Sequence, residues 1–187
     1  SAINSIGNHA TSIPGAALPQ GQNAVKEFIP VARISDMLLN PGAPFDYDGT
    51  AYTYPDIRLV YWAGGNPFHH HQDLNRLPEA WRKPDTVVVH EWCWNPLAKM
   101  ADIVLPATMF LEHDDIYQSG GHQHITLGPK IINPPEGCRS NHEVVCALAE
   151  RLGAKHPGFD MDAKMLIDAT LQSSGWGTLA ELEEKRW

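Results

Sequence analysis

The sequence is poor in several features that mark common classes of protein. Its three cysteines, Cys93, Cys138 and Cys146, form no CxxC pair and follow no regular spacing, which argues against a zinc knuckle or a disulfide framework. No apolar run approaches the roughly 20 residues that a membrane-spanning helix needs. Positive charge is also scarce, because 14 Lys and Arg residues stand against 22 Asp and Glu, a net charge of −8. The sequence predicts neither a membrane span nor a nucleic-acid partner.

The first residues lack both an initiator Met and the basic-then-apolar layout of a secretion signal. We therefore expect a segment of a longer protein whose targeting region lies elsewhere. The compartment, cytoplasm or periplasm, stays open on this evidence.

At 187 residues the chain is long enough for one substantial core with a smaller appendage. Residues 1–30 are rich in Gly, Pro, Ala, Asn and Gln without apolar periodicity, and predict a poorly packed extended arm. We expect one α/β domain over residues 31–155 and a helical extension over residues 156–187.

Strand and helix signals alternate in the middle of the chain. Strand-like runs at 57–62, 86–90 and 103–105 are separated by helical segments at about 70–81 and 97–101. This alternation is typical of a Rossmann-like, doubly wound, mainly parallel sheet with flanking helices. The β-branched run 87–89 further predicts a central strand buried on both faces.

Outside this core, we expect a short helix over 31–39, a turn-rich stretch over 41–55, a strand over 124–127, and helices near 162–172 and 178–186. Ser140 and Glu143 form a capping box that begins a further helix, which Gly153 ends. The apolar positions expected on the inner face of that helix are Val144, Val145, Leu148 and Leu152.

The most informative local motif is Gly64-Gly65-Asn66-Pro67, at the carboxyl end of the first core strand. Open α/β sheets bind ligands at this edge, and glycine allows backbone N–H groups to approach an anion closely. The motif therefore predicts a phosphate site. A plain strand-to-helix turn, which also needs glycine, explains the same residues equally well.

Glu91 directly follows the second core strand, roughly 25 positions after Asn66. In a nucleotide-binding unit this position faces the nucleoside, where a carboxylate can accept from a ribose hydroxyl or from the N1–H and amino donors of guanine. The alternative is a solvent-exposed or salt-bridged acid.

Other reactive residue types give weaker patterns. Three consecutive histidines at positions 69–71 point in different directions, so no metal site is expected there. No Gly-x-Ser-x-Gly elbow is present. The acidic cluster at 112–115 favours a polar loop or a cofactor contact over acid–base catalysis. We expect no catalytic residue in this chain.

Two longer motifs carry a resemblance to a known family: YWAGGNPFHHHQDLNR at residues 61–76 and ADIVLPAT at residues 101–108. Together they resemble the dimethyl sulfoxide, trimethylamine N-oxide and biotin sulfoxide reductase branch of the molybdopterin oxidoreductases. The similarity covers about residues 18–155.

The resemblance implies a cofactor, its site and a set of partners. In that family two molybdopterin guanine dinucleotides hold one molybdenum ion, and two Rossmann-like domains each bind one dinucleotide. By position, the matching contacts are Gly64, Gly65, Asn66, His70, His90, Glu91 and His113. The partners implied are the other domains of the parent enzyme, a small-molecule substrate and an electron-transfer protein. An iron–sulfur cluster outside this chain stays open.

One departure from the family pattern concerns His113. Close members usually read Glu-Arg-Asn-Asp where this chain has Glu-His-Asp-Asp at 112–115, so an expected arginine contact is replaced by His113. The substrate therefore stays open. Two competing hypotheses are a free-standing nucleotide-binding module and an NAD-dependent enzyme, the latter disfavoured by the absence of GxGxxG.

Overall fold

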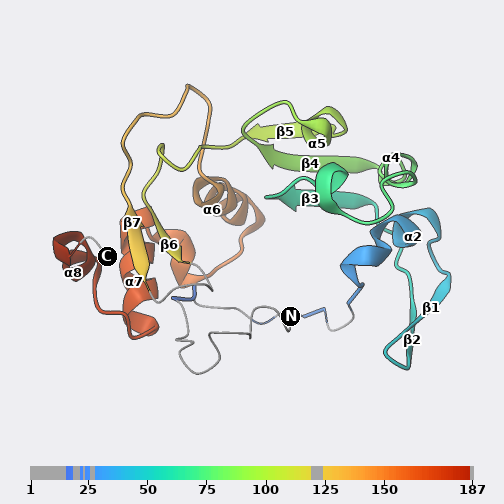
Figure 1. Ribbon diagram of the computed structural model, residues 1–187, viewed down its shortest axis with the longest axis horizontal. Helices are drawn as coiled ribbons and strands as arrows, with labels where there is room; N and C mark the ends of the chain where they lie inside the picture. Colours follow the sequence, from blue (N-terminus) through green and yellow to red (C-terminus); the bar gives the residue numbers. More distant parts are fainter. Residues whose placement is uncertain (1–15, 19–21, 23, 26–27, 119–123, 186–187) are drawn as a thin grey trace. The chain divides into compact units, whose positions relative to one another are not determined.

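The computed structural model describes residues 16–18, 22, 24–25, 28–118 and 124–185 (Figure 1). Contacts divide the chain into two compact units. The parallel-sheet unit is Asn23–Ala107, and the C-terminal unit combines Ser1–Gln22 with Thr108–Trp187. The domain boundaries expected after residues 30 and 155 stay predictions.

The parallel-sheet unit contains a three-stranded parallel sheet, which confirms the expected α/β class. Its elements are η1 Val31–Arg33, α2 Ile34–Leu39, β1 Pro44–Tyr47, β2 Thr50–Thr53, β3 Leu59–Ala63, α3 Pro67–His70, α4 Leu77–Ala80, β4 Thr86–Glu91, α5 Pro96–Lys99 and β5 Ile103–Pro106. The strand order is β3-β4-β5, with β4 in the centre (Figure 1).

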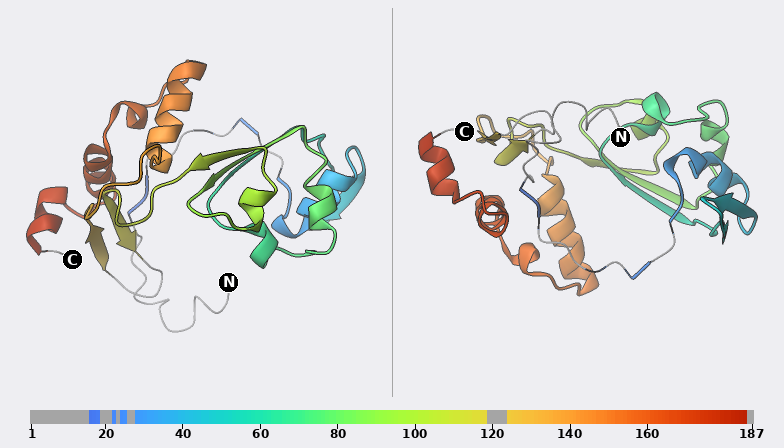
Figure 2. Two further views of the ribbon diagram at one scale, coloured as in Figure 1. Left: turned by 90° about the horizontal axis from the view of Figure 1, so that it is seen from above. Right: turned by 60° about the horizontal axis from the view of Figure 1, so that its bottom comes forward.

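Both crossovers of this sheet place their helices on one face (Figure 2). Parallel strands joined in sequence by right-handed crossovers require this arrangement, because each connection returns over the same side. The covered face contributes Val87 and Val89, which pack with Leu77, Trp81 and Leu97 in the core. β4 fills the centre of that core with its alternate residues.

The other face of the sheet is less well covered. Leu59 is 57% exposed, Tyr61 42% and Ile103 48%, and Val88 between them is half-buried. On this face β4 itself is half-buried at Thr86 and Val88 and buried at His90, so the expected burial of the central strand on both faces is confirmed in part, and the exposed residues are those of β3 and β5.

The helix expected over residues 70–81 is also wrong in part. It is two four-residue helices, α3 and α4, separated at residues 71–76. Asp73 has φ +60°, a left-handed conformation that no helix interior accommodates, and it pairs with Arg76. Pro78 then sits in the first turn of α4, where its missing N–H costs nothing.

The stretch expected to be rich in turns at 41–55 contains an antiparallel hairpin, β1–β2. Its two-residue turn is Asp48-Gly49, and both residues have positive φ. That is the conformation of the turns that best match the twist of a hairpin, and Asp-Gly is a preferred pair for it. The signal was present in the sequence.

The C-terminal unit combines a two-stranded antiparallel sheet with helices (Figure 1). Its elements are β6 Asp115–Gln118, β7 Ile125–Gly128, α6 Asn141–Leu152, η2 Pro157–Asp160, α7 Ala163–Ser173 and α8 Leu179–Lys185. Its core includes Ile125, Ile167 and Leu171. The expected strand and three helices are confirmed, whereas β6 was not anticipated.

A short piece of the N-terminal arm packs against this unit. Ala16 is buried, and its backbone N–H and C=O make two hydrogen bonds of 2.8 Å with the side-chain amide of Gln118. Ala17 donates to the Ser174 hydroxyl at 2.9 Å. Residues 16–18 are thus anchored by side-chain amide and hydroxyl groups, and residues 1–15 lie outside the described residues.

Helix α6 begins and ends as its sequence predicts. Ser140 accepts from the Glu143 backbone and Glu143 caps in return, while Gly153 takes the left-handed C-cap. Its inner face is not the expected one, because Val145, Leu148 and Leu152 are 40%, 37% and 81% exposed. Among the described residues, no helix is long and apolar enough to cross a membrane.

The core of the parallel-sheet unit makes a stability prediction. Leu77→Ala empties a fully buried position and is expected to lower the free energy of unfolding by about 2–5 kcal/mol. Leu74→Ala, at a leucine that is 41% exposed, is the matched control and should cost less than about 1 kcal/mol. Urea unfolding followed by tryptophan fluorescence measures both, and equal losses would contradict this description of the core.

Candidate cofactor-binding site

The glycine loop that follows β3 has a conformation that needs glycine. Gly64 has φ +91° and Gly65 has φ +71°. The Trp62 indole N–H donates to the carbonyl oxygens of Gly64 at 2.7 Å and Gly65 at 3.3 Å. The side chain therefore fixes which way the peptide groups of the loop face.

Asn66 ends the loop as the N-cap of α3. Its Oδ1 accepts from the Phe68 backbone N–H at 3.1 Å, and Pro67 occupies the first helical position. Neither the Gly65 nor the Asn66 N–H donates to an acceptor within the described residues. These two amides fit an anion, whereas α3 is too short for its dipole to add much.

Two of the three consecutive histidines pack against the glycine loop or against the strand before it. The His70 ring packs over Gly65, so that a Cβ at Gly65 would lie 3.3 Å from His70 Cε1. His71 packs edge-on against Trp62 with ring centroids 5.4 Å apart. Partial burial and the neighbouring His70 lower the pKa of His71, which favours its neutral form. Of the predicted contacts, His70 thus borders the loop directly.

Parallel pairing places the end of β4 beside the glycine loop. Ala63 pairs with His90, so the residues that follow, Gly64 and Glu91, leave the same edge of the sheet. Glu91 is only 8% exposed, and its Oε1 accepts from Asn95 Nδ2 at 2.6 Å. The predicted phosphate and nucleoside positions therefore lie on neighbouring strands.

His90 and Glu91 point to opposite faces of the sheet, as consecutive strand residues must. Glu91 shares the helix-covered face with Val89, and His90 shares the other face with Tyr61. The Tyr61 hydroxyl lies within hydrogen-bond distance of His90 Nε2, and desolvation at that end of the ring raises the pKa of the phenol. The phenol therefore stays protonated at neutral pH, and the direction of its hydrogen bond to His90 is set by the tautomer of the imidazole.

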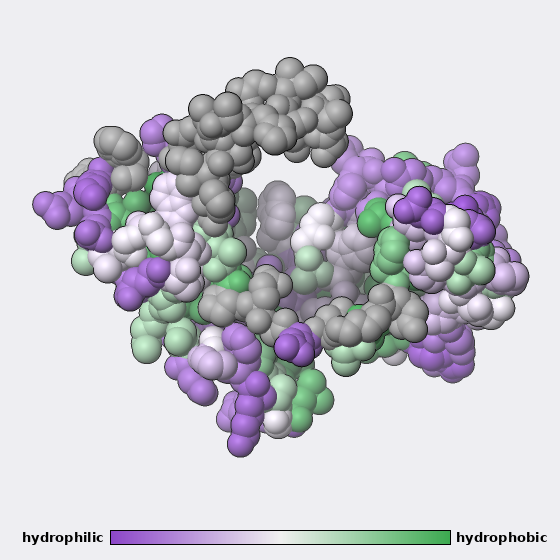
Figure 3. All heavy atoms as spheres, turned by 90° about the horizontal axis from the view of Figure 1, so that it is seen from below, coloured by the Kyte–Doolittle hydropathy of each residue, from purple (hydrophilic) through white to green (hydrophobic). Residues whose placement is uncertain are grey.

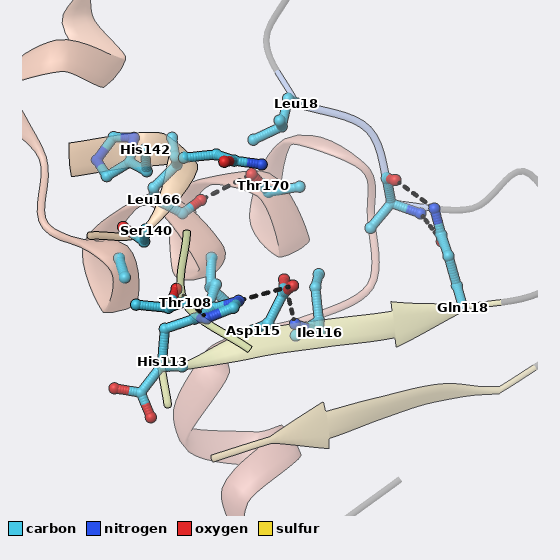
Figure 4. A pocket seen from close by; sticks show the side chains of 15 residues that line it. Leu18, Thr108, His113, Asp115, Ile116, Gln118, Ser140, His142, Leu166 and Thr170 are labelled. Atoms are coloured by element: carbon cyan, nitrogen blue, oxygen red, sulfur yellow. Dashed lines mark hydrogen bonds and ion pairs between the residues drawn. The ribbon is translucent and has the colours of Figure 1, made fainter. Parts of the chain in front are cut away.

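His113, the remaining predicted contact, belongs to the C-terminal unit. Its Nδ1 lies 2.8 Å from the Thr108 hydroxyl, and its Nε2 lies 3.7 Å from an Asp115 carboxylate oxygen. Figure 4 shows His113 between these two side chains at the edge of a cavity of about 430 Å³, with Ser140 and His142 across it. Its imidazole is thus held by partners of its own unit.

Metal-binding and redox groups are not gathered in the described residues. No cluster of three or more His, Cys, Asp or Glu side chains suited to a metal ion is present there. Burial and the nearby Asp160 raise the pKa of the Cys146 thiol, so it is the weakly nucleophilic protonated form.

The sequence did not reveal the side chains that hydrogen-bond to the predicted site residues. Asn95 contacts Glu91, Tyr61 contacts His90, and Thr108 contacts His113. Asn95 is also the N-cap of α5. Its distance of four positions from Glu91 was a usable signal, whereas the Tyr61–His90 pair depends on the strand register and could not be found without the fold.

Comparison with known proteins places this fold and this loop in one family. The family model for molybdopterin oxidoreductases matches residues 3–151. A biotin sulfoxide reductase of Cereibacter sphaeroides is 47% identical over 151 residues, which are 81% of this chain and 20% of that protein. A dimethyl sulfoxide/trimethylamine N-oxide reductase of Rhodobacter capsulatus is 50% identical over 127 residues, 67% of this chain and 15% of that protein.

The chain belongs to the molybdopterin oxidoreductase family, whose members are enzymes with a molybdenum–molybdopterin cofactor. It spans about a fifth of the length of the curated relatives it matches. Among solved structures, acetylene hydratase from Pelobacter acetylenicus shares the fold with a TM-score of 0.57 at 17% identity, covering 70% of this chain and 18% of that one.

The glycine loop makes a prediction with a built-in control. Gly65→Ala and Gly64→Ala should each cost about 1–2 kcal/mol, because both force a residue with a Cβ into positive φ. Only Gly65→Ala should also displace His70, since nothing lies within 4 Å of a Cβ at Gly64. NMR shifts of the His70 ring read out this difference, and a ring that moves in neither variant would contradict the packing described.

Proposed function

We propose that this chain forms part of the cradle for one guanine dinucleotide of a bis(molybdopterin guanine dinucleotide) molybdenum cofactor. The observation that carries the proposal is the pairing of Ala63 with His90, which sets the glycine loop and the Glu91 carboxylate side by side at the carboxyl edge of a parallel sheet. Ligands of open α/β sheets bind at this edge.

Different residues contact different parts of the dinucleotide. The N–H groups of Gly65 and Asn66 donate to a phosphate oxygen, and Gly64 allows the backbone to come close. Glu91 accepts from the purine. His70, beside the loop, donates to the same phosphate or to a sugar hydroxyl.

His90 and His113 complete the proposed contacts from different positions. His90 leaves the face of the sheet opposite to Glu91, so it meets a ligand that crosses the ends of the strands. His113 belongs to the C-terminal unit, and the family resemblance, which implies an arginine at this position, suggests it as a donor to an anionic group of the cofactor.

The remaining domains of the enzyme complete the structure. We propose that the sheet is one half of a Rossmann-like, doubly wound fold, in which helices from the rest of the enzyme cover Leu59, Tyr61 and Ile103. Hydrophobic residues lie at the surface of both units, interleaved with hydrophilic ones (Figure 3). The exposed side chains of Leu59, Tyr61 and Ile103 on one face of the sheet support a chain that works within a larger protein rather than as a free-standing module.

The whole enzyme would act on a small substrate, with an electron-transfer protein as redox partner. Relatives are reductases of sulfoxides and of trimethylamine N-oxide. The molybdenum cofactor would supply oxygen-atom or two-electron transfer. The part played by this chain is to bind, orient and desolvate the dinucleotide, without a catalytic group of its own.

Binding of GDP against ADP, measured by isothermal titration calorimetry on this chain, tests the proposal. Wild type is expected to prefer GDP, because guanine offers two donors to a carboxylate where adenine offers an acceptor at N1. Glu91→Gln removes the charge and should weaken GDP binding about 10- to 100-fold while leaving ADP unchanged.

The other outcomes discriminate between the hypotheses. Tighter ADP binding, insensitive to Glu91→Gln, would favour an NAD-type site and contradict the proposal. The control Glu79→Gln changes an exposed carboxylate of the same unit, in α4, and should leave both affinities as they are.

A further inference from the structure

The Glu91 carboxylate is held from one side only. Its residue is 8% exposed, and the donor to its Oε1 is the Asn95 side chain at 2.6 Å. Within the described residues, no second donor reaches this carboxylate. A buried carboxylate with one donor has acceptor capacity left for a ligand.

The orientation of the Asn95 amide is determined by its second contact. Asn95 Oδ1 accepts from the Ala98 backbone N–H at 2.9 Å and so caps α5. The amide nitrogen must then face Glu91, because exchanging the two ends would set oxygen against carboxylate and N–H against N–H. The contact between Asn95 and Glu91 is therefore a true donor–acceptor pair.

The backbone on both sides of this pair is fixed as well. The Glu91 carbonyl accepts from Ala107 N at 3.1 Å, which ties the end of β4 to the chain after β5. The Asn95 N–H donates to the Cys93 carbonyl at 2.9 Å, which closes the turn between the strand and the helix. A rigid frame thus holds donor and acceptor at one distance.

We propose that Asn95 is a positioning residue for purine selection: by occupying one oxygen of Glu91, it directs the other oxygen to the N1–H and 2-amino donors of a guanine base. This inference rests on the proposed guanine dinucleotide site. Asn95 does not touch the ligand, and it acts by fixing the rotamer of Glu91 and keeping its second oxygen available.

The proposed role requires the amide group of Asn95, because an N-cap that lacks this donor cannot position Glu91. Serine and aspartate are equally good N-caps, since both offer an oxygen to the helix N–H groups. Serine is too short to reach Glu91 and aspartate would repel it, so neither can donate as Asn95 does. Asn95→Ser and Asn95→Asp therefore separate positioning from capping.

The experiment compares GDP, IDP and ADP binding by calorimetry for wild type, Asn95→Ser, Asn95→Asp and Glu91→Gln. GDP affinity should fall about 5- to 10-fold in Asn95→Ser and further in Asn95→Asp, where two carboxylates face each other. ADP affinity should stay unchanged. IDP lacks the 2-amino group, so its affinity should fall less than that of GDP.

Replacement of an N-cap residue on another helix is the control for the effect of capping alone. Asp162 caps α7 through Met165 N at 2.8 Å, and Asp162→Ser should change neither nucleotide affinity. Thermal unfolding of Asn95→Ser should show only a moderate loss of stability, because the cap is retained while the buried Glu91 carboxylate loses its donor. A large loss of stability together with equal losses for GDP and ADP would show a structural role and overturn the inference.

Failure of this inference differs from failure of the proposed function. If Glu91→Gln weakens GDP binding while both Asn95 variants bind like wild type, Asn95 is a helix cap and the guanine site stands. If Glu91→Gln has no effect, the assignment of Glu91 is wrong. If the wild-type chain binds neither nucleotide, both proposals are overturned for this chain.

Discussion

Parallel pairing of β3 with β4 is the constraint on which the candidate site depends. The register that sets Ala63 against His90 brings the glycine loop and Glu91 to one edge of the sheet. A slip of one residue would move Glu91 to the opposite face, away from α5 and Asn95. Val87 and Val89 prevent such a slip, because they are buried in the core that α4 and α5 cover. Packing in the core thus determines which side chains meet at the carboxyl edge of the sheet.

The three-stranded sheet is covered on one face more completely than on the other, and this asymmetry follows from the order of its strands. Two right-handed crossovers in sequence order cover one face, so the second face needs chain that winds in the opposite direction. Leu59, Tyr61 and Ile103 are exposed there, as Leu148 and Leu152 are on α6. Burying such side chains stabilises a protein by roughly 1.5–3 kcal/mol each, so these surfaces are where neighbouring domains would gain most.

Local signals in the sequence gave the correct local structure. The capping box at Ser140, the loop at Gly64 and the strand before Glu91 each depend on residues a few positions apart, and each forms as expected. Two expectations based on helical periodicity were wrong. The left-handed Asp73 breaks a segment whose periodicity looked helical, and α6 turns an apolar face outward because the described residues supply nothing to cover it. The contacts of His90 with Tyr61 and of Glu91 with Asn95 required the register and the faces of the sheet.

The family resemblance implies an arginine at position 113, and the histidine that this chain carries there differs from it in charge and in donors. Arginine carries a fixed positive charge and five donors, whereas an imidazole carries a full charge only when protonated and offers at most two donors. At His113 both ring nitrogens already face Thr108 and Asp115. An anion that meets this side chain must therefore displace one of these partners or share it. The backbone N–H groups of Gly65 and Asn66 in the glycine loop, by contrast, are donors that no change of protonation can remove.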